Sequence, residues 1–245
     1  MGRETKSLSL RQNERMRSQA ILSGLLLAAI CFSQTPPPEQ PPVDSLTPTI
    51  TIGGLRQRAE SGDPAAQFDL GVKYHEGQDV PQDYAEAMRW FRMAADQGNP
   101  DAQFNLGVMY EKGRGAPPNY EDALRWYQKA ADQEYAPAEY NLGVMFDKSR
   151  GVPLDFTEAM RWYQKAANQS YAAAQYNLGL LYYYGQGTPQ DYTQAHMWIS
   201  LAAASATGED QKKFSKMRDE VASKMTPAQM ADAERLAQAW KPEGK

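Results

Sequence analysis

A period of 36 residues runs through the middle of the chain, and this feature restricts the fold more than any other. The pair Leu-Gly, a tryptophan, a proline and an alanine each recur at this interval without an insertion. The Leu-Gly pairs begin at Leu70, Leu106, Leu142 and Leu178, and the tryptophans are Trp90, Trp126, Trp162 and Trp198. A period of this length is typical of solenoids, in which neighbouring units complete one another's core. The sequence therefore predicts four stacked units over residues 63–206, with the boundaries 63–98, 99–134, 135–170 and 171–206.

Each unit is predicted to contain two helices. In the second unit, apolar residues over Asp101–Lys112 are spaced as in a helix, and the turn signal Gly113–Pro117 ends it. A second helix is expected to begin after Asn119, because Asp122 follows at the capping-box spacing. The chain has 34 alanines but only 12 isoleucines and valines, which favours close-packed helices over sheets. The predicted fold class is therefore all-α, a right-handed α-solenoid of helix-turn-helix repeats.

Small residues recur where the two helices of a unit are expected to meet. The glycine of each Leu-Gly pair allows a close approach, and we expect an aromatic residue of the facing helix to fill the remaining space. The four tryptophans share one register of the second helix. We therefore interpret them as core residues rather than as a ligand site.

Three segments of the second unit resemble the Sel1-like repeat, a relative of the tetratricopeptide repeat. They are Gln103–Tyr110, Gly113–Pro117 and Ala123–Ala131. The resemblance covers roughly residues 63–206 and implies four helix-turn-helix copies. Asp79 and Ser149 depart from it, since they stand at loop positions where the family has glycine.

Both ends of the repeat array are expected to be capped. Residues 53–62 align with the end of a unit and read as an N-terminal capping half-repeat. Residues 207–245 are predicted to form C-terminal capping helices. The first has Phe214, Met217 and Val221 on one face, and the second begins at Thr226 as N-cap with proline following.

The N-terminus has the pattern of a targeting segment. A basic stretch precedes the apolar run Ala20–Phe32, whose 13 residues suit a signal peptide and fall short of a membrane-spanning helix. We predict a signal peptide at residues 1–33, a Pro-rich linker at 34–52, and a periplasmic or secreted protein. Lipidation at Cys31, retention as a membrane anchor, and translation from Met16 rather than Met1 remain alternatives.

The composition argues against most catalytic and metal chemistry. The single cysteine, Cys31, excludes an intramolecular disulfide and a cysteine-based metal cluster. The two histidines, His75 and His196, lie three repeats apart and cannot share a site. A net charge of −4 offers no basic surface for nucleic acid. We therefore expect no enzyme activity, no cofactor, no metal and no nucleic-acid partner, and membrane contact only through an uncleaved N-terminal segment.

The tetratricopeptide relationship implies where a partner would bind. In that family, peptides lie in the groove lined by the first helices, and the residue before Leu-Gly can hydrogen-bond the peptide backbone. The candidate partner-binding residues are therefore Asn105, Asn141 and Asn177, with Phe104, Tyr140 and Tyr176 beside them and Lys112 and Lys148 further out. An amide side chain both donates and accepts, which suits an extended chain. The alternative is that these asparagines bridge repeats inside the stack.

Three functional hypotheses follow. The first is an exported, non-enzymatic scaffold that binds a protein or extended peptide in the groove of the solenoid, with an envelope regulatory or assembly pathway as its expected setting. The second is a weak β-lactam-binding or hydrolysing enzyme, as in the cysteine-rich branch of the family, although no cysteine follows residue 31. The third is a self-associating structural spacer.

Overall fold

The computed structural model describes residues 51–242, which lie within one compact unit of the chain. These residues form helices and no strands. The helices are α2 Ile52–Glu60, α3 Pro64–Glu76, α4 Tyr84–Asp96, α5 Pro100–Lys112, α6 Tyr120–Ala131, α7 Ala136–Asp147, α8 Phe156–Asn168, α9 Ala172–Tyr184, α10 Tyr192–Ser205, α11 Gly208–Ala222 and α12 Pro227–Ala239. The predicted signal peptide, and the predicted linker as far as residue 50, lie outside the described residues.

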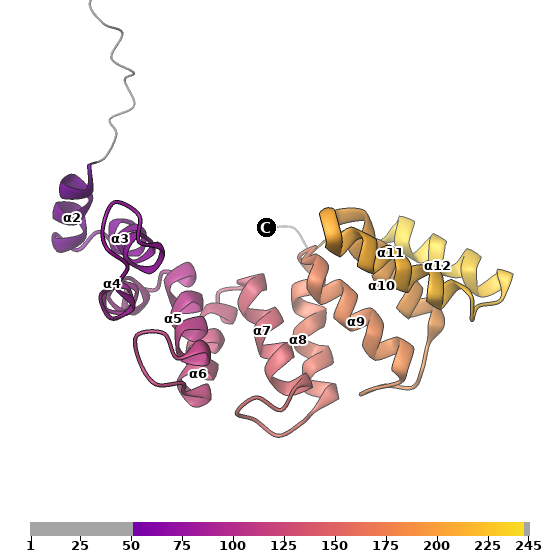
Figure 1. Cartoon of the computed structure of the whole chain (residues 1–245). Helices are drawn as coiled ribbons and strands as arrows, with labels where there is room; N and C mark the ends of the chain where they lie inside the picture. Colours follow the sequence, from indigo (N-terminus) through magenta and orange to yellow (C-terminus); the bar gives the residue numbers. More distant parts are fainter. Residues whose placement is uncertain (1–50, 243–245) are drawn as a thin grey trace, which may run out of the picture. The chain divides into compact units, whose positions relative to one another are not determined.

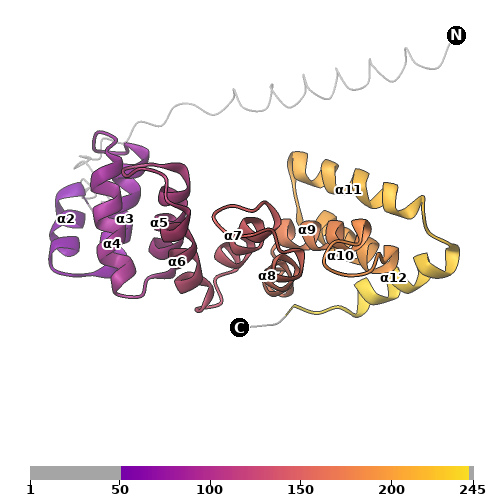
Figure 2. The ribbon, with the colours of Figure 1, turned by 90° about the horizontal axis from the view of Figure 1, so that it is seen from below.

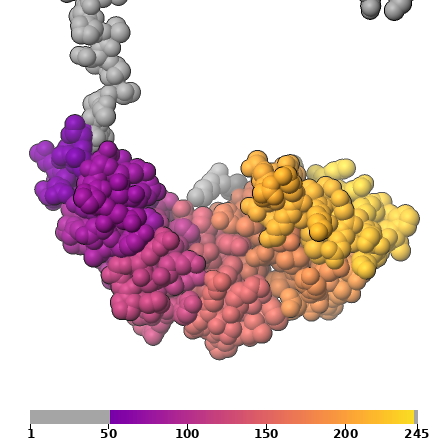
Figure 3. Space-filling view, viewed as in Figure 1, coloured from indigo at the N-terminus to yellow at the C-terminus, as the bar shows by residue number. Residues whose placement is uncertain are grey.

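Helices α3 to α10 form four consecutive pairs, one for each 36-residue period. Figures 1 and 2 show the pairs stacked side by side. In Figure 2 the first helices (α3, α5, α7, α9) lie along one side and the second helices (α4, α6, α8, α10) along the other. In the view of Figure 3 the upper side of this stack is hollowed between the purple units and the orange helix α11. The predicted all-α solenoid is therefore confirmed.

The Leu-Gly glycines bring the two helices of each pair into close contact. The facing pairs are Gly71–Phe91, Gly107–Tyr127, Gly143–Tyr163 and Gly179–Ile199. A Cβ atom added to any of these glycines would lie 2.5–2.6 Å from a side-chain atom of its partner. The expected close approach is confirmed, although an isoleucine replaces the aromatic residue in the fourth unit.

The four tryptophans are core residues, with only 3–6% of each exposed. Each tryptophan packs in a core cluster with residues of the helices that precede its own helix. Trp126 packs in one cluster with Phe91 of the first unit, and Trp162 packs with Tyr127 of the second. The tryptophans therefore hold successive units together.

The second helix of each unit begins at an Asx N-cap, as predicted. The N-cap residues are Asp83, Asn119, Asp155 and Asp191, and the side chain of each accepts a hydrogen bond from a backbone amide of the first turn. These bonds satisfy amides that have no partner inside the helix. A full capping box, with its reciprocal second bond, is formed by Thr226 and Gln229 at the start of α12.

The two loop residues that replace the family's glycines keep the turn. Asp79 and Ser149 have φ angles of 62° and 53°, in the left-handed region that glycine adopts most easily. Aspartate tolerates this conformation better than most residues. Both loops therefore keep a left-handed residue at this position, although neither has glycine there.

A row of buried polar side chains also follows the 36-residue period. Its members are Gln67, Gln103, Glu139 and Gln175, each at most 5% exposed. The side-chain amides of the three glutamines donate to the carbonyls of Ala59, Ala95 and Ala167, at 3.1, 3.1 and 3.2 Å. These bonds satisfy carbonyls at the end of the preceding helix. The three glutamines therefore connect their first helices to the helix that comes before each of them.

Glu139 is the exception in this row, because it has a carboxyl group where the other three members have an amide. Gln169 donates to it at 2.9 Å. We expect Glu139→Gln to raise the free energy of unfolding by about 0.5–2 kcal/mol, because burial penalises an ionisable carboxyl group and an amide of the same shape carries no charge. Urea denaturation at pH 7 measures the change, and the reverse substitution Gln103→Glu should lower stability. A less stable Glu139→Gln variant would contradict this reading.

The capping helices cover both ends of the array. Helix α2 packs on α3, and its Leu55 shares a core cluster with Trp90. Helices α11 and α12 pack on α10, and Phe214 of α11 stacks on Tyr176 with ring centroids 4.3 Å apart. Apolar surface at each end is therefore covered by helices from outside the four repeats.

Candidate functional site

The C-terminal ends of the first helices form a polar row on the first-helix side. Two members of this row contact an arginine in the loop of the following unit. The Nε2 atom of His75 lies 3.2 Å from Arg114 Nη1, and Glu111 accepts a hydrogen bond from Arg150 Nη1 at 2.7 Å. Each pair spans 39 residues, so the same contact recurs one period later. These pairs connect neighbouring units along the edge of the candidate groove.

Burial shifts the pKa values of two groups at this row, Tyr127 and His75. The Tyr127 hydroxyl donates to Glu111 at 2.8 Å, and burial, followed by the Glu111 carboxylate, raises the pKa of Tyr127 far above its usual range. The hydroxyl therefore stays protonated and donates. Burial, followed by the Arg114 guanidinium, lowers the pKa of His75, so its imidazole is neutral at pH 7 and can accept from that arginine.

The three candidate asparagines are half-buried and hydrogen-bonded within the stack. Their partners are the Asp101 carbonyl for Asn105, the Tyr127 hydroxyl for Asn141, and the Tyr140 and Tyr163 hydroxyls for Asn177. Asn141 and Asn177 thus bridge consecutive units, as the structural alternative expects. A partner that used these amides would have to share or replace those bonds.

A cavity of about 130 Å³ lies between the third and fourth units and unites two of the candidate residues. Its lining side chains are Asp147, Lys148, Asn177, Leu180, Leu181, Tyr184 and Gln186. Lys148 is 60% exposed and lies 3.0 Å from Asp147, and Tyr184 is 59% exposed. The cavity therefore combines an amide, an ion pair and apolar surface next to solvent. Lys112, at the end of α5, is also exposed but does not line it.

The candidate aromatic residues pack mainly within the protein. Phe104 and Tyr140 are half-buried and lie against Tyr127 and Tyr163, with ring centroids 5.8 Å apart in both pairs. Tyr176 is 8% exposed. Phe214 of α11 stacks on its ring, so little of Tyr176 is open to a partner on the first-helix side.

The sequence argument missed the loop residues that complete this side of the stack. Arg114, Arg150 and Gln186 stand at one position of the period, directly after the first helix of their units. Arg114 and Arg150 pair with the preceding unit, and Gln186 lines the cavity. These polar residues follow the Leu-Gly pair of their unit at a constant distance in the sequence, and this pattern could have identified them.

Neither a three-residue metal cluster nor a membrane-spanning helix is found among residues 51–242. Among residues 51–242, histidine, cysteine, aspartate and glutamate nowhere gather in a group of three that could hold a metal ion. Over the same range, each helix is too short or too polar to cross a membrane.

A solved structure of moderate sequence identity shares the repeat architecture. A Sel1 repeat protein from Oxalobacter formigenes is 34% identical in sequence, and the match covers 67% of this chain and 68% of that chain with a TM-score of 0.61. The protein c5321, described as a protective antigen of uropathogenic Escherichia coli strains displaying an SLR fold, is 31% identical, with 77% of this chain and 47% of that chain covered and a TM-score of 0.47.

A curated relative matches over a shorter stretch. EsiB from Escherichia coli O6:H1, named as a secretory immunoglobulin A-binding protein, is 42% identical over 45 residues, which are 18% of this chain and 9% of EsiB. The chain therefore aligns with only a small part of that relative. The Sel1 repeat itself matches at residues 64–99, 100–135, 136–171 and 172–206, each frame ending within one residue of the predicted units. With four consecutive repeats over more than half of its length, the chain belongs to the Sel1 repeat family.

Proposed function

We propose that this protein is an exported, non-enzymatic scaffold that binds a protein or extended peptide on its first-helix side. The observation that carries the proposal is the cavity between the third and fourth units, which unites Lys148 and Asn177 with the exposed ring of Tyr184. A large, rigid aromatic side chain beside a charged group is typical of the residues that dominate protein interfaces. Sel1 repeats are a protein-interaction fold, which supports the same class of function.

The chemistry of the cavity suits a peptide segment. Its volume of about 130 Å³ leaves room for one small side chain against Leu180 and Leu181. The Asn177 amide can donate to a peptide carbonyl or accept from a peptide amide, and Lys148 can pair with a carboxylate. We expect Asn105, Asn141 and Lys112 to extend this contact along the preceding units.

Export is supported by the sequence pattern of residues 1–33, with a basic start and a short apolar run. The name of EsiB, a secretory immunoglobulin A-binding protein, supports protein binding as the class of function but identifies no partner here, because the shared stretch is 45 residues. N-terminal sequencing of the protein recovered from the source organism would show whether the segment is removed. A mature chain that begins at Met1 and remains in the cytoplasm would contradict export.

Photo-crosslinking tests the binding side directly. We expect a benzoylphenylalanine at position 184 to give one saturable adduct with a partner protein in the source organism. The same group in place of Arg235 on α12, whose side chain is 70% exposed, serves as the control and should not give that adduct. An adduct with a second copy of the chain would favour the self-associating spacer. Equal labelling from both positions would contradict a site on the first-helix side.

Removal of the exposed groups of the cavity should weaken binding without unfolding the protein. We expect Lys148→Gln, which removes the charge but keeps a polar side chain beside Asp147, combined with Tyr184→Ala to reduce affinity for the crosslinked partner at least tenfold, which corresponds to about 1.4 kcal/mol. Because both side chains are well exposed, the free energy of unfolding should change by less than about 0.5 kcal/mol for each substitution. Titration and thermal denaturation of the same variant measure both effects. Unchanged affinity would remove both residues from the site.

A further inference from the structure

The second-helix side contains three equivalent junctions between neighbouring helices. They lie between α4 and α6, between α6 and α8, and between α8 and α10, and each contains one buried tryptophan at the same position of the period: Trp126, Trp162 and Trp198. Because the repeats are equivalent, the surroundings of these three indoles can be compared position by position. The comparison shows that two junctions are occupied and one is open.

An arginine fills the first junction. The guanidinium of Arg92, on α4, lies 5.2 Å from the ring centre of Trp126 and 5.8 Å from that of Tyr110, and it donates a hydrogen bond to the Tyr110 hydroxyl. The guanidinium thus contacts two aromatic rings. Arg92 therefore covers the indole of Trp126 with a side chain of the same protein.

Helix α12 covers the third junction. Leu236, Ala237 and Trp240 pack against the core cluster that contains Trp198, and the Trp240 ring meets the Trp198 ring edge-on with centroids 6.0 Å apart. Leu236 and Trp240 are four residues apart, so they lie on one face of the helix end. An amphipathic helix is therefore the natural occupant of this type of junction.

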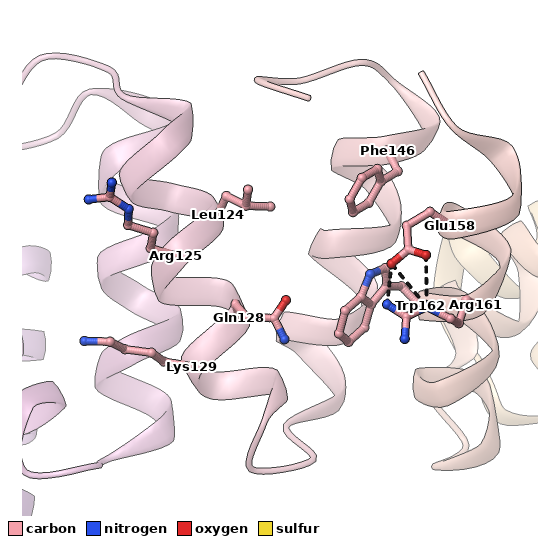
Figure 4. A pocket seen from close by; sticks show the side chains of 8 residues that line it. All are labelled: Leu124, Arg125, Gln128, Lys129, Phe146, Glu158, Arg161 and Trp162. Carbon is pink, nitrogen blue, oxygen red and sulfur yellow. Dashed lines mark hydrogen bonds and ion pairs between the residues drawn. The ribbon is translucent and has the colours of Figure 1, made fainter. Parts of the chain in front are cut away.

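The second junction has neither cover. Gln128 stands where Arg92 stands one unit earlier, and its amide turns away to donate to Asp132 at 2.8 Å. Phe146 replaces Tyr110 and lacks the hydroxyl that anchors the arginine. A groove of about 420 Å³ remains, lined by Leu124, Arg125, Gln128, Lys129, Phe146, Glu158, Arg161 and Trp162. Figure 4 shows Leu124 and Gln128 on one wall, facing Phe146 and Trp162 on the other.

The charges at this groove favour an acidic occupant. Arg161 and Lys165 lie over the Trp162 ring, at 4.7 and 4.5 Å from its centre. Glu158 pairs with Arg161, so the Lys165 ammonium leaves an excess of positive charge beside the indole. Figure 4 shows the Arg125 and Lys129 side chains pointing away from the groove, so they add less. A carboxylate on the occupant would therefore be attracted to this wall.

We propose that the groove between α6 and α8 is a second docking site, which binds an acidic amphipathic helix of a partner protein. The helix inserts a leucine and an aromatic side chain four residues apart between Leu124, Phe146 and Trp162, as α12 covers Trp198 within the chain. Its carboxylates meet Lys165 and Arg161. This site is separate from the first-helix side, so the scaffold could hold two partners at once.

The chain's own α12 sequence is a suitable probe. A fluorescein-labelled peptide with the sequence of residues 226–240 should bind the full protein saturably, with one peptide per chain, in a fluorescence anisotropy titration. Replacing its leucine and tryptophan by alanine should weaken binding at least tenfold. Replacing its two acidic residues by lysine should also weaken binding. No saturable binding, or binding indifferent to these changes, would overturn the proposal.

The first junction supplies the matched protein variants. Gln128→Arg with Phe146→Tyr reproduces the arginine cover and should weaken peptide binding at least tenfold without lowering the melting temperature. Leu124→Asp, which places a carboxylate on the wall, should have the same effect on binding if the double variant does not fold. Conversely, Arg92→Gln opens the first junction and should raise the stoichiometry towards two peptides per chain.

The full-length protein distinguishes a foreign partner from a second copy. We expect a monomer in solution, because α12 already covers Trp198 of its own chain. A dimer that the Gln128→Arg, Phe146→Tyr variant abolishes would overturn a foreign partner as the occupant. Peptide affinity unchanged in both the double variant and Leu124→Asp would overturn the groove as the site.

Discussion

Replacing Trp126 by alanine should lower the free energy of unfolding by about 3–5 kcal/mol, the range for removal of a large core aromatic side chain. The indole is 6% exposed and packs with Phe91 and Ala94 of the first unit and with Leu106 of the second. In a solenoid, stability is the sum of the unit stabilities and the contacts between neighbours. Because Trp126 contributes to such a contact, its loss should also uncouple the first unit from the rest. We expect a broadened or two-step transition in thermal denaturation followed by circular dichroism.

An exposed aromatic residue provides the control for this experiment. Tyr184→Ala removes a ring that is 59% exposed, and the free energy of unfolding should change by less than about 0.5 kcal/mol. Its transition should remain as sharp as that of the unchanged protein. A sharp Trp126→Ala transition within about a degree of the unchanged protein would contradict the role of the tryptophan as a contact between units.

The fold was predictable because the same pattern of packing and capping residues occurs four times in the sequence. A single helix-turn-helix pattern is ambiguous, but Leu-Gly, tryptophan and the Asx N-cap at one constant interval leave few alternatives. Each signal also has a local physical cause, such as the close approach at Gly107 or the capping bond of Asn119. Agreement between local and global signals is what makes such a sequence readable.

The candidate site was less predictable because it depends on what differs between units. Tyr176 looks equivalent to Phe104 and Tyr140 in the sequence, yet α11 covers it because it is in the last repeat. Likewise, the exchange of Arg92 for Gln128 is visible in the sequence, but the direction in which the glutamine turns is not. A periodic sequence predicts the average unit, whereas a binding site forms where one unit departs from that average.

A substitution at the close contact between a Leu-Gly glycine and its facing side chain should also lower stability strongly. Gly143→Ala should lower the free energy of unfolding by about 1–3 kcal/mol, the usual cost of overpacking a core. The added Cβ would lie 2.5 Å from a ring carbon of Tyr163, and this ring is fully buried and cannot move aside. Urea denaturation at neutral pH measures the loss.

The control substitution is another glycine in a helix. Gly53→Ala in α2 adds a methyl group whose nearest neighbour is 3.9 Å away, and it should stabilise the protein by about 0.5–1 kcal/mol because alanine favours the helix. The two substitutions make the same chemical change and should have opposite signs. Tyr163→Leu removes the ring, so Gly143→Ala should cost less in that background, and the double-mutant cycle isolates the contact. Equal costs in both backgrounds would mean that the glycine is required by the backbone of α7 and not by the facing ring.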